Sequence, residues 1–122
     1  MVCILVIDDD ELVRTTLSRT LTAAGYEVIE ACNGDVGLRK FQGGNVDLVI
    51  TDILMPEKEG LQTIQELREA DGNMRIIAIS GGDRLGNKSY LGMAVALGAD
   101  DALAKPYRRQ ELLAKIDAVL NA

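Results

Sequence analysis

The sequence predicts an α/β protein with a doubly wound, five-stranded parallel sheet and five helices distributed over both of its faces. Aliphatic runs without polar alternation, such as Ile4–Ile7 and Leu48–Ile50, suit strands that are buried on both faces of a parallel sheet. Such runs alternate five times with segments whose apolar residues recur at helical spacing. Strands that alternate with helices in this way form parallel βαβ units.

The first half of the chain holds two strand–helix units. Val2–Ile7 is the first predicted strand, and Gly25 follows the first helix where a C-cap glycine belongs. Tyr26–Ala31 is the second strand, and the short helix Asp35–Gln42 ends at the turn residues Gly43–Asn45. The first helix is expected over Glu11–Ala24, with one face made of Leu12, Val13, Thr16, Leu17, Thr20 and Leu21.

The second half repeats the pattern three times. Val46–Thr51 and Met74–Ile79 are aliphatic strands, and the amphipathic helix Glu59–Ala70 lies between them, stopped by Asp71-Gly72-Asn73. A glycine-rich loop comes after the fourth strand. The last predicted elements are a helix over Ser89–Leu97, a short strand over Asp101–Ala104 and an amphipathic helix over Arg108–Leu120.

Length and composition indicate one domain over residues 1–122 with an aliphatic core, because 48% of the residues are hydrophobic and only 3% are aromatic. The formal charge of -6 argues against a general nucleic-acid binder. No apolar run is long enough for a signal peptide or a membrane span, so a cytoplasmic location is expected. Cys3 and Cys32 are expected to be small buried residues rather than metal ligands.

The chain has no histidine. This excludes Ser-His-Asp and Cys-His catalysis and histidine-based zinc sites. If the protein handles phosphate through phosphohistidine, the histidine must belong to another protein.

Three carboxylates follow two of the predicted strands: Asp8 and Asp9 come after the first, and Asp52 ends the third. The carboxyl ends of neighbouring parallel strands line the ligand crevice, so these acids are expected to converge. Carboxylates that close repel one another unless a cation or proton lies among them, and an all-oxygen ligand set indicates Mg²⁺. Aspartate is also a good helix cap, and this simpler role is expected for Asp10.

Two further polar residues end strands at the same edge of the sheet: Ser80 after the fourth and Lys105 after the fifth, where Pro106 follows. Together with the acids and a cation, a hydroxyl and an ammonium group would suit a tetrahedral dianion such as a phosphoryl group. The simpler alternatives are an ordinary loop serine and a surface lysine.

These residues lie in four segments that resemble the receiver domain of two-component response regulators of the chemotaxis-regulator type. The segments are ILVIDDD (4–10), DLVITDILMP (47–56) with Gly60 following, IAIS (77–80) and GADDALAKP (98–106). The resemblance covers essentially the whole chain and implies the flavodoxin-like strand order 2-1-3-4-5.

The resemblance implies that Asp52 accepts a phosphoryl group. Asp9 and Asp52 would bind Mg²⁺ directly, Asp8 would support the ion through water, and the backbone carbonyl of Leu54 would be a further ligand. The phosphoryl oxygens would be contacted by Lys105.

Two other roles follow from the same resemblance. Ser80 would move to hydrogen-bond the phosphoryl group, and Pro106 would follow a cis peptide bond, which only X-Pro bonds adopt at low cost. Many receivers carry an aromatic residue three positions before the lysine, but this chain has Ala102 there. The change on phosphorylation is therefore expected in Ser80 and the 81–88 loop.

The function implied is that of a stand-alone response regulator in phosphorelay signal transduction. It would receive its phosphoryl group from a histidine kinase or phosphotransfer protein and signal through protein contacts, without binding nucleic acid or inserting into a membrane. It would not be an enzyme beyond promoting its own phosphorylation and dephosphorylation. The alternatives are a receiver fragment of a larger regulator, a phosphohydrolase with Asp8 as nucleophile and Asp10 as acid/base, and a flavin mononucleotide carrier.

Overall fold

A computed structural model of the chain describes residues 1–53, 60–80, 94–95 and 98–122. Its five strands form one parallel sheet in the order β2-β1-β3-β4-β5, which confirms the predicted fold class and strand order. Each strand lies within two residues of its predicted position. The strands are β1 (Cys3–Ile7), β2 (Glu27–Ala31), β3 (Leu48–Asp52), β4 (Arg75–Ser80) and β5 (Asp101–Ala104).

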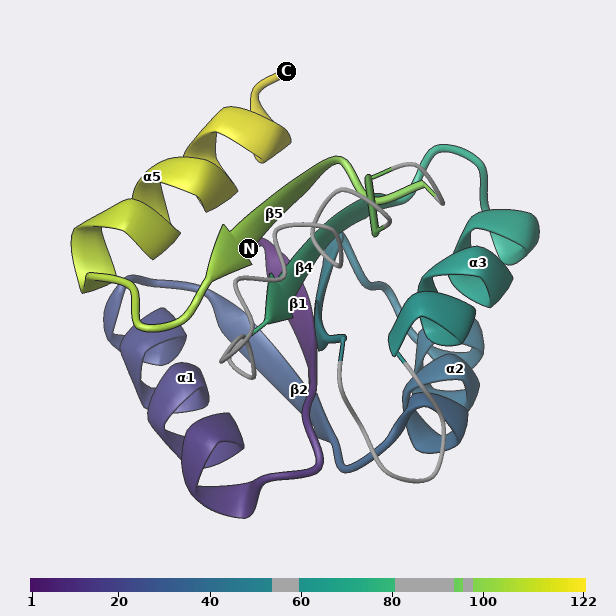
Figure 1. The fold of residues 1–122 in the computed structure, drawn as a ribbon, viewed down its shortest axis with the longest axis horizontal. Helices are drawn as coiled ribbons and strands as arrows, with labels where there is room; N and C mark the ends of the chain where they lie inside the picture. The colour runs from purple at the N-terminus through teal and green to yellow at the C-terminus, as the bar shows by residue number, and fades with distance from the viewer. Residues whose placement is uncertain (54–59, 81–93, 96–97) are drawn as a thin grey trace.

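Helices cover both faces of the sheet, as predicted (Figure 1). The helix predicted over residues 89–97 falls mostly outside the described residues, although Ala94 and Val95 are helical. No helix within the described ranges is long and apolar enough to cross a membrane. The helices bounded within those ranges are α1 (Glu11–Ala23), α2 (Gly34–Gly43), α3 (Gly60–Ala70) and α5 (Arg109–Leu120).

The alternation of side chains along each strand divides the core into two clusters. In β1, Ile4 and Val6 face α1 and α5, where they pack with Leu17 and Leu112. Leu5 and Ile7 face the other layer, where they pack with residues of α3 such as Ile64. Both clusters are aliphatic, as the composition predicted, and together they bury β1 and β3 completely.

Two residues are more exposed than their sequence patterns indicate, and for Cys32 the predicted burial is wrong. Leu12 lies on the predicted apolar face of α1 but is 76% exposed, because it precedes the part of the helix that lies against the sheet, where Leu17 and Leu21 are buried. Cys32 is exposed, since it follows the last residue of β2, whereas Cys3 is buried inside β1 as expected.

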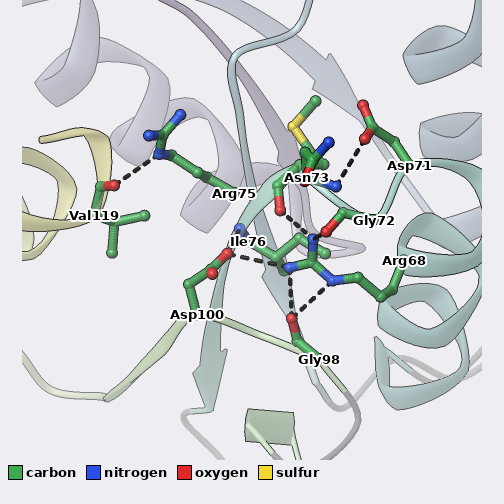
Figure 2. A network of polar contacts seen from close by, with 10 residues as sticks. Arg68, Asp71, Gly72, Asn73, Arg75, Ile76, Gly98, Asp100 and Val119 are labelled. Carbon is green, nitrogen blue, oxygen red and sulfur yellow. Dashed lines mark hydrogen bonds and ion pairs between the residues drawn. The ribbon is translucent and has the colours of Figure 1, made fainter. Parts of the chain in front are cut away.

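Arg68 of α3 fixes the chain just before β5 (Figure 2). Its Nε and Nη2 atoms donate to the Gly98 carbonyl at 3.1 and 2.6 Å, and Nη1 donates to the Gly72 carbonyl at 2.9 Å. Arg68 also pairs with the Asp100 carboxylate at 3.2 Å, and Asp100 accepts from the backbone N–H of Ile76 at 2.7 Å. These contacts tie α3, β4 and the entry to β5 together at the end of the sheet where β4 begins.

Candidate functional site

The register of the sheet sets the ends of β1, β3, β4 and β5 side by side. Ile7 pairs with Thr51, so that Asp8 and Asp52 come next on neighbouring strands. The Lys105 N–H donates to the Ser80 carbonyl at 2.8 Å, which continues the β4–β5 pairing one residue beyond β5. Between them, Asp52 of β3 pairs with Ile79 of β4, so that three strand pairs bring the predicted residues to one edge.

Asp8, Asp9 and Asp52 form an acidic cluster in which one carboxylate oxygen of each lies within 4.8 Å of those of the other two. Asp8 is only 3% exposed and Asp52 only 9%, while Asp9 is exposed. Burial raises the pKa of Asp8, and the neighbouring charge of Asp9 adds to the increase. The hydrogen bond that Asp8 accepts from the Asp10 N–H, at 2.9 Å, and the charge of Lys105 oppose it.

Lys105 supplies positive charge to this site. Its Nζ lies 3.5 Å from Oδ2 of Asp8 and 3.8 Å from Oδ2 of Asp52. It reaches both carboxylates from the turn after β5, where the Lys105–Pro106 peptide bond is cis, as predicted. Among the described residues, one ammonium group beside three carboxylates leaves the site with an excess of negative charge.

The donor set fits Mg²⁺. An octahedral ion with ligands at about 2.0–2.1 Å places its ligand oxygens roughly 3 to 4 Å apart, and the cluster spans up to 4.8 Å. Three carboxylate oxygens this close together match the hard oxygen ligands that this ion prefers. The predicted fourth ligand, the Leu54 carbonyl, lies outside the described residues.

Ser80 lies at the end of β4 beside this cluster and is 1% exposed. Within the described part of the chain its Oγ has no hydrogen-bond partner. A buried hydroxyl without a partner is costly, and the hydrogen bond that Ser80 is expected to make to a phosphoryl group stays a prediction. The loop after Ser80, in which the sequence predicted part of the response, lies outside the described residues.

Gly60 allows α3 to begin directly against the end of β3. Its N–H donates to the Ile53 carbonyl at 2.8 Å, and a Cβ there would overlap the Asp52 carbonyl oxygen. Only glycine fits this approach, because the atoms in the way belong to the backbone. Gly60, which follows the segment DLVITDILMP (47–56), thus packs directly against the backbone of Asp52, the expected phosphoacceptor.

Asp10 caps α1, as expected from the sequence. Its Oδ1 accepts from the N–H groups of Leu12 and Val13 at 2.9 and 3.2 Å. A carboxylate held by two backbone donors at a helix start is poorly placed for the acid/base role that a phosphohydrolase would need. This observation counts against the phosphohydrolase alternative.

Two residues near the site were not singled out from the sequence. Arg14 of α1 donates to the backbone carbonyl of Asp8. Burial raises the pKa of Tyr107, and the nearby charge of Asp8 adds a smaller increase. Neither could be recognised from spacing alone, because their proximity depends on how α1 and the turn after β5 pack on the sheet.

Ala102 lies in β5 opposite Ala78 of β4 and packs against the α2/α3 side of the core. Its methyl group has no rotamer that could change on phosphorylation. The change on phosphorylation is still expected in Ser80 and the 81–88 loop. This stays a prediction, because residues 81–88 lie outside the described part of the chain.

Comparison with known proteins agrees with this geometry. Residues 4–117 match the family model of the response regulator receiver domain. The chain is 34% identical to the chemotaxis protein CheY of Bacillus subtilis over 97% of both chains. It is 35% identical to a probable transcriptional regulator, ycf27, of Cyanidium caldarium, over 97% of this chain and 46% of that protein.

A solved structure of the response regulator TrrA from Thermotoga maritima, in complex with Mg²⁺ and a beryllium fluoride, is similar throughout. It superposes with a TM-score of 0.87 at 34% identity, over 98% of this chain and 99% of that one. The chain spans about half the length of several curated relatives, which are transcriptional regulators. The match over residues 4–117, the strand order and the acidic cluster agree: this chain belongs to the family of response regulator receiver domains of two-component systems.

Proposed function

We propose that this receiver domain is a Mg²⁺-dependent phosphoacceptor, in which Asp52 receives a phosphoryl group from a phosphohistidine of another protein. Receiver domains are signalling domains that accept phosphoryl groups from histidine kinases and act on downstream proteins. The finer proposal assigns roles to residues of this chain: Asp52 as acceptor, Asp8 and Asp9 as cation ligands, and Lys105 and Ser80 as contacts of the phosphoryl oxygens.

The observation that carries the proposal is the convergence of side chains from three strand ends. The acidic cluster and Lys105 Nζ occupy one edge of the sheet, with Lys105 within 4 Å of both Asp8 and Asp52. A cation and an ammonium group on two sides of Asp52 would balance the charge of an incoming phosphoryl group. The presence of Mg²⁺ and a beryllium fluoride in the complex of the related TrrA supports a site of this kind.

The transfer requires little of the protein beyond positioning and charge. A carboxylate oxygen of Asp52 forms a bond to phosphorus while the P–N bond to the donor histidine breaks, and its electron pair remains on the imidazole nitrogen. Lys105 stabilises the charge on the phosphoryl oxygens, and the Ser80 hydroxyl donates to the acyl phosphate that results. A bound Mg²⁺ would neutralise charge on the carboxylates and the phosphoryl oxygens.

This proposal is tested by incubating the protein with Mg²⁺ and a small phosphodonor such as acetyl phosphate, then measuring its intact mass. We expect a gain of one phosphoryl group that disappears in Asp52→Asn and on chelation of the metal. Labelling of Asp52→Asn at the wild-type level would show that the acceptor is another residue.

A groove between α1 and α5 is the surface we assign to the phosphodonor protein. The groove has a volume of about 400 Å³ and is mainly apolar, with one charged residue in its lining. The lining residues are Leu12, Val13, Thr16, Leu17 and Thr20 of α1, Arg109 and Leu112 of α5, and Tyr107. Tyr107 links the groove to the site: burial raises its pKa, and the nearby charge of Asp8 adds to the increase. Since the chain has no histidine, its donor must bring one next to Asp52, and a mainly apolar groove that shares Tyr107 with the neighbourhood of Asp8 suits a helix that carries it.

Leu12→Lys should slow transfer from the phosphodonor protein without altering the reaction with acetyl phosphate. The side chain is 76% exposed, so its loss costs little stability, but lysine removes apolar contact area and adds a second positive charge to that of Arg109 in the groove, which opposes docking. We expect a loss of about 5- to 30-fold in the transfer rate at low donor concentration, equivalent to roughly 1–2 kcal/mol.

The measurement compares both phosphodonors on one protein preparation, using any phosphohistidine protein that labels the wild type. Val95→Lys is the matched control, because Val95 is also an exposed apolar residue, 48% exposed, next to Ala94 in the core cluster on the other face of the sheet. If Leu12→Lys and Val95→Lys accept phosphate from the protein donor equally fast, the groove is not the docking surface.

A further inference from the structure

Asp8 and Asp9 are neighbours in sequence, yet their carboxylates lie in the same cluster. In an extended strand, consecutive side chains point to opposite faces. The chain must therefore turn at the peptide that joins Asp8 to Asp9, directly after β1 ends at Ile7. The orientation of this one peptide decides whether both acids can reach a single ion.

The peptide groups around Asp8 are held from two sides. The Asp8 N–H donates to the Ala31 carbonyl of β2 at 3.1 Å. The Asp8 carbonyl, which belongs to the peptide between the two acids, accepts from Nη1 of Arg14 at 2.8 Å. A carbonyl in such a position needs a donor, and Arg14 supplies one from the second turn of α1.

Arg14 is itself held in place. Its Nε donates to Oε1 of Glu30 at 3.1 Å, and its side chain is only 16% exposed. Glu30 lies beside the end of β1 because the parallel register pairs it with Val6. The rigid guanidinium fork thus connects β2 to the Asp8–Asp9 peptide, which a flexible lysine could not do in the same geometry.

We infer that Arg14 is a positioning residue for the acidic cluster: by holding the Asp8 carbonyl, it turns the Asp8–Asp9 peptide so that both carboxylates face Asp52 and can bind one cation. This inference rests on the proposed function, because it assumes that the cluster binds Mg²⁺. It assigns no contact between Arg14 and the ion or the phosphoryl group.

When Arg14 is replaced, the Mg²⁺ affinity should change in the direction opposite to that expected from charge alone. Replacing Arg14 by an uncharged residue removes a cation from the neighbourhood of the site, which by charge alone would strengthen Mg²⁺ binding. Loss of the hydrogen bond that orients the Asp8–Asp9 peptide would instead weaken Mg²⁺ binding. Partners that orient metal ligands typically contribute about 10- to 100-fold in metal affinity, and we expect a loss in this range for Arg14→Met.

The test is the dissociation constant for Mg²⁺ alone, measured by titration calorimetry on wild type, Arg14→Met and Arg68→Met, together with the melting temperature of each without metal. Arg68 is the matched control: it is also a partly buried arginine that donates to backbone carbonyls and pairs with a carboxylate (Figure 2), but it lies at the end of the sheet where β4 begins, away from the acidic cluster. Arg68→Met should lower the melting temperature while leaving the Mg²⁺ affinity unchanged.

A weaker affinity in Arg14→Met alone supports the inference. Affinity that is unchanged or stronger in Arg14→Met, or that falls equally in Arg68→Met, overturns it while leaving the proposed function standing. If the wild type binds no Mg²⁺, the proposed function fails and this inference with it. Arg14→Gln, whose amide is too short to reach both partners, replaces Arg14→Met if that variant does not fold, with the same expected sign.

Discussion

Lys105→Met should accept phosphate from acetyl phosphate about 10²–10³-fold more slowly than the wild type at saturating Mg²⁺, a loss of about 2.7–4 kcal/mol in transition-state stabilisation. Lys105 Nζ lies within 4 Å of both Asp8 and Asp52. Without it, charge that builds up on the phosphoryl oxygens in the transition state would have to be balanced by the metal alone. Methionine keeps the approximate length of the side chain and removes its charge.

The Mg²⁺ affinity of Lys105→Met distinguishes a direct effect on the phosphorylation rate from an effect through loss of the ion. Removing a positive charge from the site should leave Mg²⁺ affinity unchanged or increase it, so the slower reaction cannot be ascribed to loss of the ion. Lys115→Met is the control, because Lys115 of α5 also pairs with an aspartate, Asp101, at 3.1 Å. If Lys105→Met reacts as fast as Lys115→Met, the lysine does not act on the phosphoryl group.

Asp8→Asn should raise the melting temperature of the metal-free protein and remove most of its stabilisation by Mg²⁺. Asp8 is almost fully buried near two other carboxylates, and burial raises its pKa. Its ionised form is therefore less favourable in the folded than in the unfolded state. Binding of Mg²⁺ to the folded state should stabilise the wild type by about 2.7 kcal/mol when the metal concentration is about 100 times Kd.

The raised pKa also fixes the direction of a pH effect. Between the ordinary pKa of an aspartate and the raised value, the folded protein keeps a proton on Asp8 that the unfolded chain has lost. The free energy of unfolding contributed by this group therefore falls as the pH rises through that window. This part of the pH dependence should be missing from Asp8→Asn.

Thermal melts with and without Mg²⁺ measure both effects. Asp71→Asn is the control, since Asp71 lies just beyond α3 at the opposite end of the sheet, where it accepts from the Asn73 N–H. Equal Mg²⁺ stabilisation of Asp8→Asn and the wild type would contradict a role for Asp8 in holding the ion, whether directly or through water.

The architecture could be predicted from the sequence because it rests on local patterns. Uninterrupted aliphatic runs mark strands that are buried on both faces, and the ends of such strands meet at one edge by topology alone. Placing Asp8, Asp52, Ser80 and Lys105 together required only the positions of four strand ends. The register that sets Ile7 beside Thr51 then brought the acids within reach of one another.

What the sequence did not predict depends on packing between layers. Helical spacing put Leu12 on the buried face of α1, but the start of that helix does not lie against the sheet. The part played by Arg14 could not be predicted either, because its hydrogen bond to the Asp8 carbonyl depends on the approach of α1 to β2. Nothing in the local pattern distinguishes this arginine from a solvated one.

The site of phosphorylation is the measurement that tests the account most directly. After reaction with acetyl phosphate and Mg²⁺, reduction with borohydride converts an aspartyl phosphate to homoserine, and tandem mass spectrometry of peptides covering residues 1–24 and 47–53 locates it. The account predicts homoserine at position 52 alone, with Asp8 and Asp9 unmodified and no conversion without Mg²⁺. Homoserine at position 8 or 9, or conversion at position 52 that is as extensive in the presence of a chelator, would contradict it.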